Sequence, residues 1–298
     1  MSQMMRKRRR SSGLMAALAL SSAALCLSCR NNVSDQPQPE AANTLECVRR
    51  ALGSSVALNS VKSLRLISEL RPSGDGTAPA PLPGKVELAF ALPDRYKRTT
   101  VSQLKDEEGV RELVNVVGFS GSNLLSGAGT KIPTRISGDQ SRPLQVARNE
   151  FSRLLFMLLV RDAPGAETTS TVERAAQGAS AQLAIHVTSP RTSASTLFVD
   201  AQTCQPSAMT YERPATMADI RREEAAGSAS SSMSRGSTVA PTGTRVVRID
   251  LSDYRESAGI RFPFLWVTSI GGKPYYEEVV SRVDVNPEIE EGYFETGP

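Results

Sequence analysis

The sequence predicts an α+β fold in which a curved, unclosed antiparallel β-barrel wraps around helices. Most of the chain consists of short segments in which apolar and polar residues alternate, which is the period of a strand with one buried face. One segment, residues 143–160, instead carries apolar residues at helical spacing and is apolar on nearly every side in its second half. Such a helix must be covered on several sides, as a sheet curved around it would do. We expect one domain over residues 43–298 of the 298-residue chain.

The N-terminal part of this domain predicts a short helix followed by strands. Leu45, Val48 and Leu52 recur at helical spacing, and Gly53 ends the helix. Alternating residues with short connections then predict antiparallel hairpins. The strands are expected at residues 64–70, 86–90, 97–101 and 110–119, with a turn at 120–123.

The helix predicted at residues 143–160 is the most apolar segment of the domain. Phe151, Leu155 and Leu158 lie in one stripe of it. As a central core helix it would pack these side chains against the sheet. As a helix that lines a lipid or partner site it would present them to a ligand. Both interpretations stay open on the sequence.

The C-terminal part predicts more strands, at residues 183–187, 196–199, 208–212, 247–251, 262–266 and 279–285. Gly271 and Gly272 predict a two-residue hairpin turn. Residues 214–242 are rich in Ala, Ser and Gly without an apolar period, so a disordered insertion is expected there. Phe262, Phe264 and Trp266 share one face of their strand. That face belongs to the core or, in an open sheet, lines a groove for acyl chains.

The first 28 residues predict a signal peptide. A basic run precedes an apolar stretch at residues 14–27, which is too short for a comfortable transmembrane helix. Ser28 stands before Cys29, as a small residue precedes the lipid-modified cysteine of bacterial lipoproteins. We expect export and lipidation of Cys29; simple cleavage with release and an uncleaved anchor are the alternatives.

Residues 29–42 contain Pro-Gln steps and no apolar periodicity, which predicts a flexible tether after the anchor. Arg30 stands where an aspartate retains many lipoproteins at the inner membrane. Its presence favours the outer membrane, so we expect a periplasm-facing, anchored lipoprotein.

The two remaining cysteines, Cys47 and Cys204, lie in the predicted domain. Two cysteines of an exported domain can pair, and a disulfide across so long a loop contributes on the order of 4 to 5 kcal/mol. Two separate buried thiols are the alternative, because sequence alone does not show proximity.

The charge and motif content argue against a nucleic-acid partner and against catalysis. The net charge is +4, but without residues 1–28 there are 30 basic against 31 acidic residues, so the basicity belongs to the leader. His186 is the one histidine and alternates with apolar neighbours, as a surface residue of a strand does. Glu277 and Glu278 are adjacent on a strand and point to opposite faces, so they cannot share a site. We expect no enzyme, no cofactor and no metal.

Several motifs resemble those of periplasmic lipoprotein-carrier and outer-membrane lipoprotein-sorting proteins. They lie at residues 93–97, 197–200, 253–255, 259–263 and 272–274, around the apolar helix. The resemblance spans residues 43–298 apart from 214–242. It implies an unclosed barrel that holds acyl chains in an apolar concave cavity. It also implies a gating arginine, for which Arg65 and Arg95 are candidates; ordinary solvated strand charges are the alternative.

Taken with this resemblance, the sequence predicts a non-catalytic envelope protein that binds lipid or lipoprotein acyl chains. The expected partners are those chains, the membrane through the anchor at Cys29, and an envelope protein. The expected ligand-binding residues are Phe151, Leu155, Leu158, Phe262, Phe264 and Trp266. A periplasmic envelope-stress sensor or scaffold, which binds a protein partner through the same groove, is the alternative.

Overall fold

The structure is a computed structural model. It describes residues 39–73, 82–106, 109–129, 141–164, 168–177, 180–189, 192–216, 219 and 243–295. All of them belong to one compact unit, residues 36–298. The predicted signal peptide and Cys29 lie outside the described residues, as does most of the predicted insertion.

Twelve antiparallel strands form a single sheet. In chain order they are β1 (Ser63–Pro72), β2 (Gly84–Ala91), β3 (Arg95–Asp106), β4 (Gly109–Ser120), β5 (Asn123–Gly129), β6 (Thr169–Gln177), β7 (Ser180–Ser189), β8 (Thr192–Asp200), β9 (Pro206–Pro214), β10 (Thr244–Ser257), β11 (Ile260–Ile270) and β12 (Lys273–Val285). Their order in the sheet is β5-β4-β3-β2-β1-β12-β11-β10-β9-β8-β7-β6. The first and last strands therefore pair in the middle of the sheet, and β5 and β6 are its two edges. In the described part of the chain the edges do not meet, which confirms the predicted unclosed sheet.

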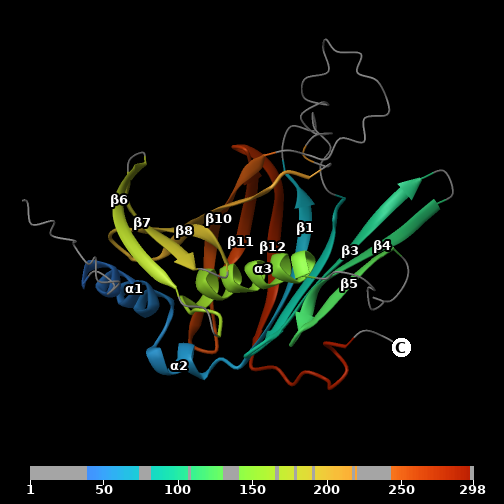
Figure 1. Ribbon diagram of the computed structural model, residues 1–298, viewed down its shortest axis with the longest axis horizontal. Coiled ribbons are helices and arrows are strands. Elements are labelled where there is room, and N and C mark those ends of the chain that lie inside the picture. The colour runs from blue at the N-terminus through green and yellow to red at the C-terminus, as the bar shows by residue number, and fades with distance from the viewer. Residues whose placement is uncertain are drawn as a thin grey trace, which may run out of the picture. The chain divides into compact units, whose positions relative to one another are not determined.

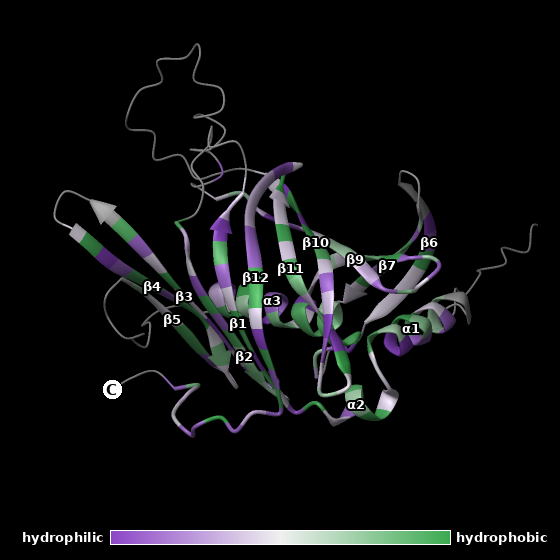
Figure 2. Ribbon diagram, turned by 180° about the vertical axis from the view of Figure 1, so that it is seen from behind, coloured by the Kyte–Doolittle hydropathy of each residue, from purple (hydrophilic) through white to green (hydrophobic). Residues whose placement is uncertain are grey.

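The helix α3 (Ser141–Leu159) lies across the concave face of this sheet (Figure 1). From Phe151 to Leu159 every residue except Arg153 is buried, because strands from both halves of the sheet surround the helix. Seen from behind, the strands are banded with hydrophobic and hydrophilic residues, as the alternation of their side chains between two faces requires (Figure 2). The prediction of an apolar helix enclosed by a curved sheet is confirmed.

Two short helices precede the sheet, and one of them corrects a prediction. The helix α1 (Pro39–Leu52) begins four residues before the predicted domain start, so residues 39–42 are helical and the predicted tether at residues 29–42 is wrong for them. Proline is well accommodated in the first turn of a helix, where its missing N–H costs nothing. The helix α2 (Ser55–Ser60) was not predicted; the side chain of Ser54 caps it by accepting a hydrogen bond from Ala57 N at 3.1 Å.

The edge strand β6 was also not predicted. Its sequence, Thr-Ser-Thr-Val-Glu-Arg-Ala-Ala-Gln, carries few large apolar residues, because an edge strand buries little of its surface. The turn between β11 and β12 is confirmed, with φ of 58° at Gly271 and 79° at Gly272. Gly118 serves a different purpose, since a Cβ there would lie 2.1 Å from the carbonyl oxygen of Tyr96 on β3.

A disulfide joins Cys47 on α1 to Cys204 in the turn between β8 and β9. The two Cα atoms lie 5.8 Å apart and the residues are separated by 157 positions. The predicted pairing is therefore confirmed, and in the chain-entropy view a loop of this length gives about 5 kcal/mol of stabilisation. The bond fixes the N-terminal helix to the C-terminal half of the sheet.

The segment after β12 covers the convex face of the sheet. Phe294 is buried against Ala89 and Leu125. The Nζ atom of Lys97 donates a hydrogen bond to the carbonyl oxygen of Tyr293 at 2.9 Å and lies 4.5 Å from the centre of its ring. The segment thus covers a part of the convex face that β2, β3 and β5 form, opposite to α3.

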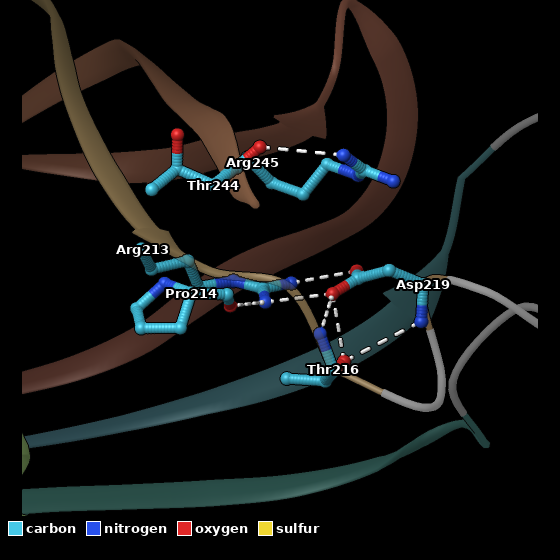
Figure 3. A network of polar contacts seen from close by, with 6 residues as sticks. All are labelled: Arg213, Pro214, Thr216, Asp219, Thr244 and Arg245. Carbon is cyan, nitrogen blue, oxygen red and sulfur yellow. Dashed lines mark hydrogen bonds and ion pairs between the residues drawn. The ribbon is translucent and has the colours of Figure 1, made fainter. Parts of the chain in front are cut away.

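The residues that begin the predicted insertion form a compact polar network (Figure 3). The guanidinium of Arg213 donates two hydrogen bonds to the carboxylate of Asp219, both at 2.8 Å. Thr216 donates two more to the same carboxylate, from its backbone N at 2.6 Å and its Oγ1 at 2.7 Å. Residues 217, 218 and 220–242 of the predicted insertion lie outside the described residues.

Candidate functional site

Aromatic side chains gather where α3 meets the N-terminal half of the sheet. Phe151 on α3 lies with its ring centre 5.7 Å from that of Phe90, 5.9 Å from Tyr96 and 5.5 Å from Phe119. We call these four residues the aromatic cluster. Edge-to-face and tilted arrangements of this kind stabilise beyond their buried area.

The other predicted ligand-binding residues lie in the same hydrophobic core. Leu155 and Leu158 of α3 and Phe262 of β11 are fully buried, and Phe264 and Trp266 are nearly so. The structure therefore brings all six predicted residues together around α3. Each contacts protein atoms, so ligand binding by these residues remains a prediction.

A small cavity of about 50 Å³ lies between α3 and the concave face. Its walls come from α3 and from strands β3, β9, β10, β11 and β12. They consist of Arg98, Glu150, Arg153, Leu154, Met157, Met209, Tyr211, Ile249, Trp266, Thr268, Tyr276 and Glu278. The cavity has room for a few water molecules and none for an acyl chain. Of the six predicted residues, Trp266 is the one among these wall residues.

Arg98, Glu150 and Glu278 of the cavity wall form, together with Ser68 behind them, a partly buried polar group that we call the ionic cluster. Glu278 is 2% exposed, and its carboxylate accepts hydrogen bonds from Ser68 Oγ at 2.8 Å and from Arg98 Nη2 at 2.7 Å. The Nη1 atom of Arg98 lies 3.5 Å from Glu150 Oε1 on α3. The cluster therefore joins β1, β3 and β12 to the helix that covers them.

The carboxylates of the cluster stabilise the positive charge of Arg98. Burial disfavours the positive charge of Arg98, but Glu278, followed by Tyr276 and Glu150, raises the pKa of Arg98 well above its usual value. Arg98 thus stays charged at every physiological pH. Buried pairs of this kind add little net stability, yet removing one partner leaves a charge without compensation.

A second guanidinium, that of Arg153, faces the same cavity one helical turn after Glu150. It lies 4.0 Å above the ring of Tyr211 and donates a hydrogen bond from Nη1 to Ser193 Oγ at 2.8 Å. Among the described residues no carboxylate pairs with Arg153. Its stacking on Tyr211 fixes the plane of the guanidinium at the cavity wall.

The tyrosines of the cavity stay protonated. Burial raises the pKa of Tyr211 to about 12, although the nearby Arg153 acts to lower it. Burial also raises the pKa of Tyr276. With the hydroxyl of Thr268, these groups give the cavity neutral hydrogen-bond donors beside its two guanidinium groups.

For the two candidate arginines, Arg65 and Arg95, the structure agrees with the alternative of ordinary strand charges. Arg65 forms an ion pair with Glu87 at 2.6 Å, on the strand face opposite to the buried Leu64 and Leu66. Arg95 lies over the ring of Phe294 on the convex side. Both candidates therefore face away from α3, whereas Arg98 reaches the helix on the concave face.

The sequence does contain a signal for the residues that were missed. Arg98 follows Tyr96 by two positions and Glu278 precedes Val280 by two, so each charge stands where the alternation places a buried side chain. A charge in phase with the buried face of a strand marks a polar group inside the fold. Which carboxylate meets which arginine could not be read, because Arg98 and Glu278 are 180 positions apart.

His186 lies outside this site. Its Nε2 is 2.9 Å from Glu173 Oε1 and its Nδ1 is 2.9 Å from Thr196 Oγ1. Its neighbours Ile185 and Val187 are buried, so His186 points to the other face of the sheet, as predicted. Within the described ranges no three metal-ligating side chains gather into a metal site. No described helix has the length and apolar character needed to cross a membrane.

No family model matches the chain, and no curated protein matches it. Solved structures similar to it include a LolA-superfamily protein from Nitrosomonas europaea, with 10% identity, a TM-score of 0.47 and coverage of 86% of this chain and 97% of that one. An outer membrane lipoprotein-sorting protein domain from Vibrio parahaemolyticus has 9% identity, a TM-score of 0.44 and coverage of 86% and 97%. LprF from Mycobacterium bovis has 10% identity, a TM-score of 0.30 and coverage of 88% and 99%.

Proposed function

We propose that this chain is an exported, non-catalytic lipid-binding protein that takes an acyl chain of a lipid or lipoprotein between α3 and the concave face of its sheet. The observation that carries the proposal is the lining of that face. Apolar side chains from both halves of the sheet converge on a helix that is buried on nearly every side, and a cavity already separates part of this helix from β9–β12.

Binding requires α3 to move, because the cavity is too small for an acyl chain. The polar contacts that hold α3 to the strands and turns include Arg98 to Glu150 at 3.5 Å, Arg153 to Ser193 at 2.8 Å and Arg148 to the carbonyl oxygen of Gly121 at 3.1 Å. Partly exposed contacts of this kind contribute about 1 kcal/mol or less each. An acyl chain gains about 0.8 kcal/mol per buried CH₂ and replaces the apolar contacts that the helix gives up.

The fluorescence of a single tryptophan can be used to measure this binding. Trp266 is its single tryptophan, lies in the wall of the cavity and is 3% exposed. We expect a long-chain fatty acid methyl ester that carries a dansyl group to accept energy from Trp266 on binding, with saturation at one or a few sites. The uncharged ester tests the apolar surface alone.

A pair of matched variants locates the binding. Met209→Phe places a ring in the cavity and is expected to weaken binding of the ester. Val246→Phe adds the same ring at a position of β10 that is 50% exposed, and it should leave binding unchanged. Equal binding by both variants would place the ester elsewhere and contradict the proposal.

The location of the protein is part of the proposal and rests on residues 1–29. The test is mass spectrometry of the full chain, purified from membranes of its own host, beside Cys29→Ala. A diacyl or triacyl mass on Cys29 together with separately bound lipid supports an anchored lipid-binding protein. An unmodified chain without lipid removes both claims and leaves the sensor or scaffold that binds a protein through the same groove.

A further inference from the structure

We propose that the charged part of the cavity beneath α3, at Arg98 and Arg153, is a site for an anionic head group, so that the preferred ligand is an acyl lipid with a carboxylate or a phosphate at its head. This inference rests on the proposed function and specifies the ligand class of the same site. It joins neighbouring features of the structure: the apolar cavity wall around Met209 together with the aromatic cluster, for the acyl tail, and the ionic cluster, for the head.

The two carboxylates beside the cavity, Glu278 and Glu150, differ in how closely their hydrogen-bond and ion-pair partners approach them. Glu278 is held by Ser68 and Arg98 at 2.8 and 2.7 Å, and these three residues belong to strands of one sheet. Glu150 belongs to the helix, its contact with Arg98 is longer, at 3.5 Å, and it also interacts with Tyr96. Of the two carboxylates, Glu150 is therefore the one that an incoming anion can replace.

Arg153 supplies a second cation for such an anion. It stands three positions after Glu150, hence on the same side of α3. Its guanidinium carbon lies 4.0 Å from the ring centre of Tyr211, and its Nη1 atom donates to a neutral hydroxyl, that of Ser193. An anion between the helix and β3 would meet Nη1 of Arg98 and the free donors of Arg153, which suit the paired oxygens of a carboxylate or phosphate.

Neutral donors complete the site. Thr268, Tyr211 and Tyr276 line the same cavity, Thr268 interacts with the hydroxyl of Tyr276, and the raised pKa values of both tyrosines keep their protons on at neutral pH. They stabilise a negative charge without adding one.

The tail would lie next to the head. Arg98 and Tyr96 are two positions apart on the same face of β3, and Glu150 is adjacent to Phe151 on α3. The aromatic cluster therefore begins where the ionic cluster ends. A fatty acid or a monoacyl phosphate lipid has this order of groups, and a neutral ester has only the tail.

The test compares three dansyl-labelled probes of equal chain length: a fatty acid, its methyl ester and a lysophosphatidic acid. Energy transfer from Trp266 reports binding to the full chain. Arg153→Gln should weaken binding of the two anionic probes about tenfold, the size of a lost charged hydrogen bond, and leave the ester unchanged. Glu150→Gln removes the competing carboxylate and should tighten the anionic probes several-fold. The matched controls are Arg174→Gln and Glu256→Gln, which change exposed residues.

The outcomes separate this inference from the proposed function. Equal binding of all three probes, unaffected by Arg153→Gln, overturns the head-group site while acyl binding stands. If no probe binds, both are wrong. Ester binding by Arg153→Gln also shows that this variant has folded. A fatty acid preferred over the phosphate assigns the site to carboxylates, and the reverse preference assigns it to phosphate head groups.

Discussion

Two buried arginine–carboxylate pairs of this protein are built in opposite ways. Asp219 accepts four hydrogen bonds, all of them from Arg213 and Thr216, which are at most six positions away. Glu278 accepts from Ser68 and Arg98, which are 210 and 180 positions away. The first carboxylate accepts three of its hydrogen bonds on Oδ2 and one on Oδ1. The second lies beside a cavity and shares its arginine with Glu150.

The difference indicates different roles. A carboxylate with four hydrogen bonds from its sequence neighbours fixes the local course of the chain, here the end of β9 (Figure 3). A carboxylate with distant partners joins separate strands, and an arginine with a loosely held second partner can exchange that partner. Burial and ion pairing alone therefore do not indicate a binding site. At Arg98 the indication comes from the adjacent cavity and from the difference between its two ion pairs, at 2.7 Å to Glu278 and 3.5 Å to Glu150.

The largest effect is expected for Glu278→Gln. After the substitution, the only carboxylate that still faces the guanidinium of Arg98 among the described residues is that of Glu150, at 3.5 Å. The free energy of unfolding should therefore fall by about 3 kcal/mol. Chemical denaturation measures it. Glu277→Gln, on the opposite face of the same strand, should change stability by no more than about 0.5 kcal/mol. Equal effects of the two substitutions would contradict the long-range role of Glu278.

A smaller loss is expected for Asp219→Asn. The amide keeps part of the hydrogen bonding but loses the charge that Arg213 pairs with, so we expect a loss of about 2 kcal/mol. The control is Asp250→Asn, since Asp250 is 45% exposed beside Arg248 and its loss should cost less than about 1 kcal/mol. If the control costs as much, the hydrogen bonds to Asp219 have no special value.

The same carboxylate makes stability depend on acid. Burial acts to raise the pKa of Asp219, but the hydrogen bonds from Arg213 and Thr216 outweigh it and hold the pKa well below its usual value. The stabilisation is fully present above the pKa of the unfolded chain, about 3.9, and is lost as pH falls from there towards the folded-state pKa. The stability difference between wild type and Asp219→Asn should therefore shrink below about pH 4. A difference that stays constant from pH 5 to pH 3 would refute this account.

The smallest effect on stability is expected for Glu150→Gln. Glu150 is 28% exposed and touches Arg98 once, at 3.5 Å, so its charge should contribute less than about 1 kcal/mol. Thermal unfolding of the Glu150→Gln and Glu278→Gln variants measures the difference between their losses of stability. A loss as large as that of Glu278→Gln would mean that Glu150 cannot be displaced, and the exchange of partners at Arg98 would be excluded.

Much of the fold could be read from the alternation of single strands. Leu64, Leu66 and Leu70 predict the buried face of β1, and the change to helical spacing at Phe151 and Leu155 predicts α3. These predictions held because strand and helix periods are local properties. Prediction failed where the local signal is weak. The strand β6 has few apolar residues and is not predicted, and the tether predicted for residues 29–42 includes Pro39, which begins α1.

The candidate site was predicted in its apolar part alone. Phe151 and Trp266 follow the apolar pattern, and both lie around α3. Arg98 and Glu278 break the pattern, and each of them is unfavourable in a core by itself. They become acceptable only as a pair, which the sequence does not reveal.

Most apolar residues that face the core could be identified from the sequence. So could the need of one apolar helix for cover on several sides, and the presence of two cysteines that can pair. These follow from periodicity and composition, which need no knowledge of distant contacts. The tertiary structure decided that β1 and β12 join in the middle of the sheet, that Cys47 meets Cys204, and that Arg98 lies between Glu278 and Glu150. The reason is that hydrogen bonds and ion pairs are short-ranged, so residues far apart in the chain can form them only after the sheet has brought them together.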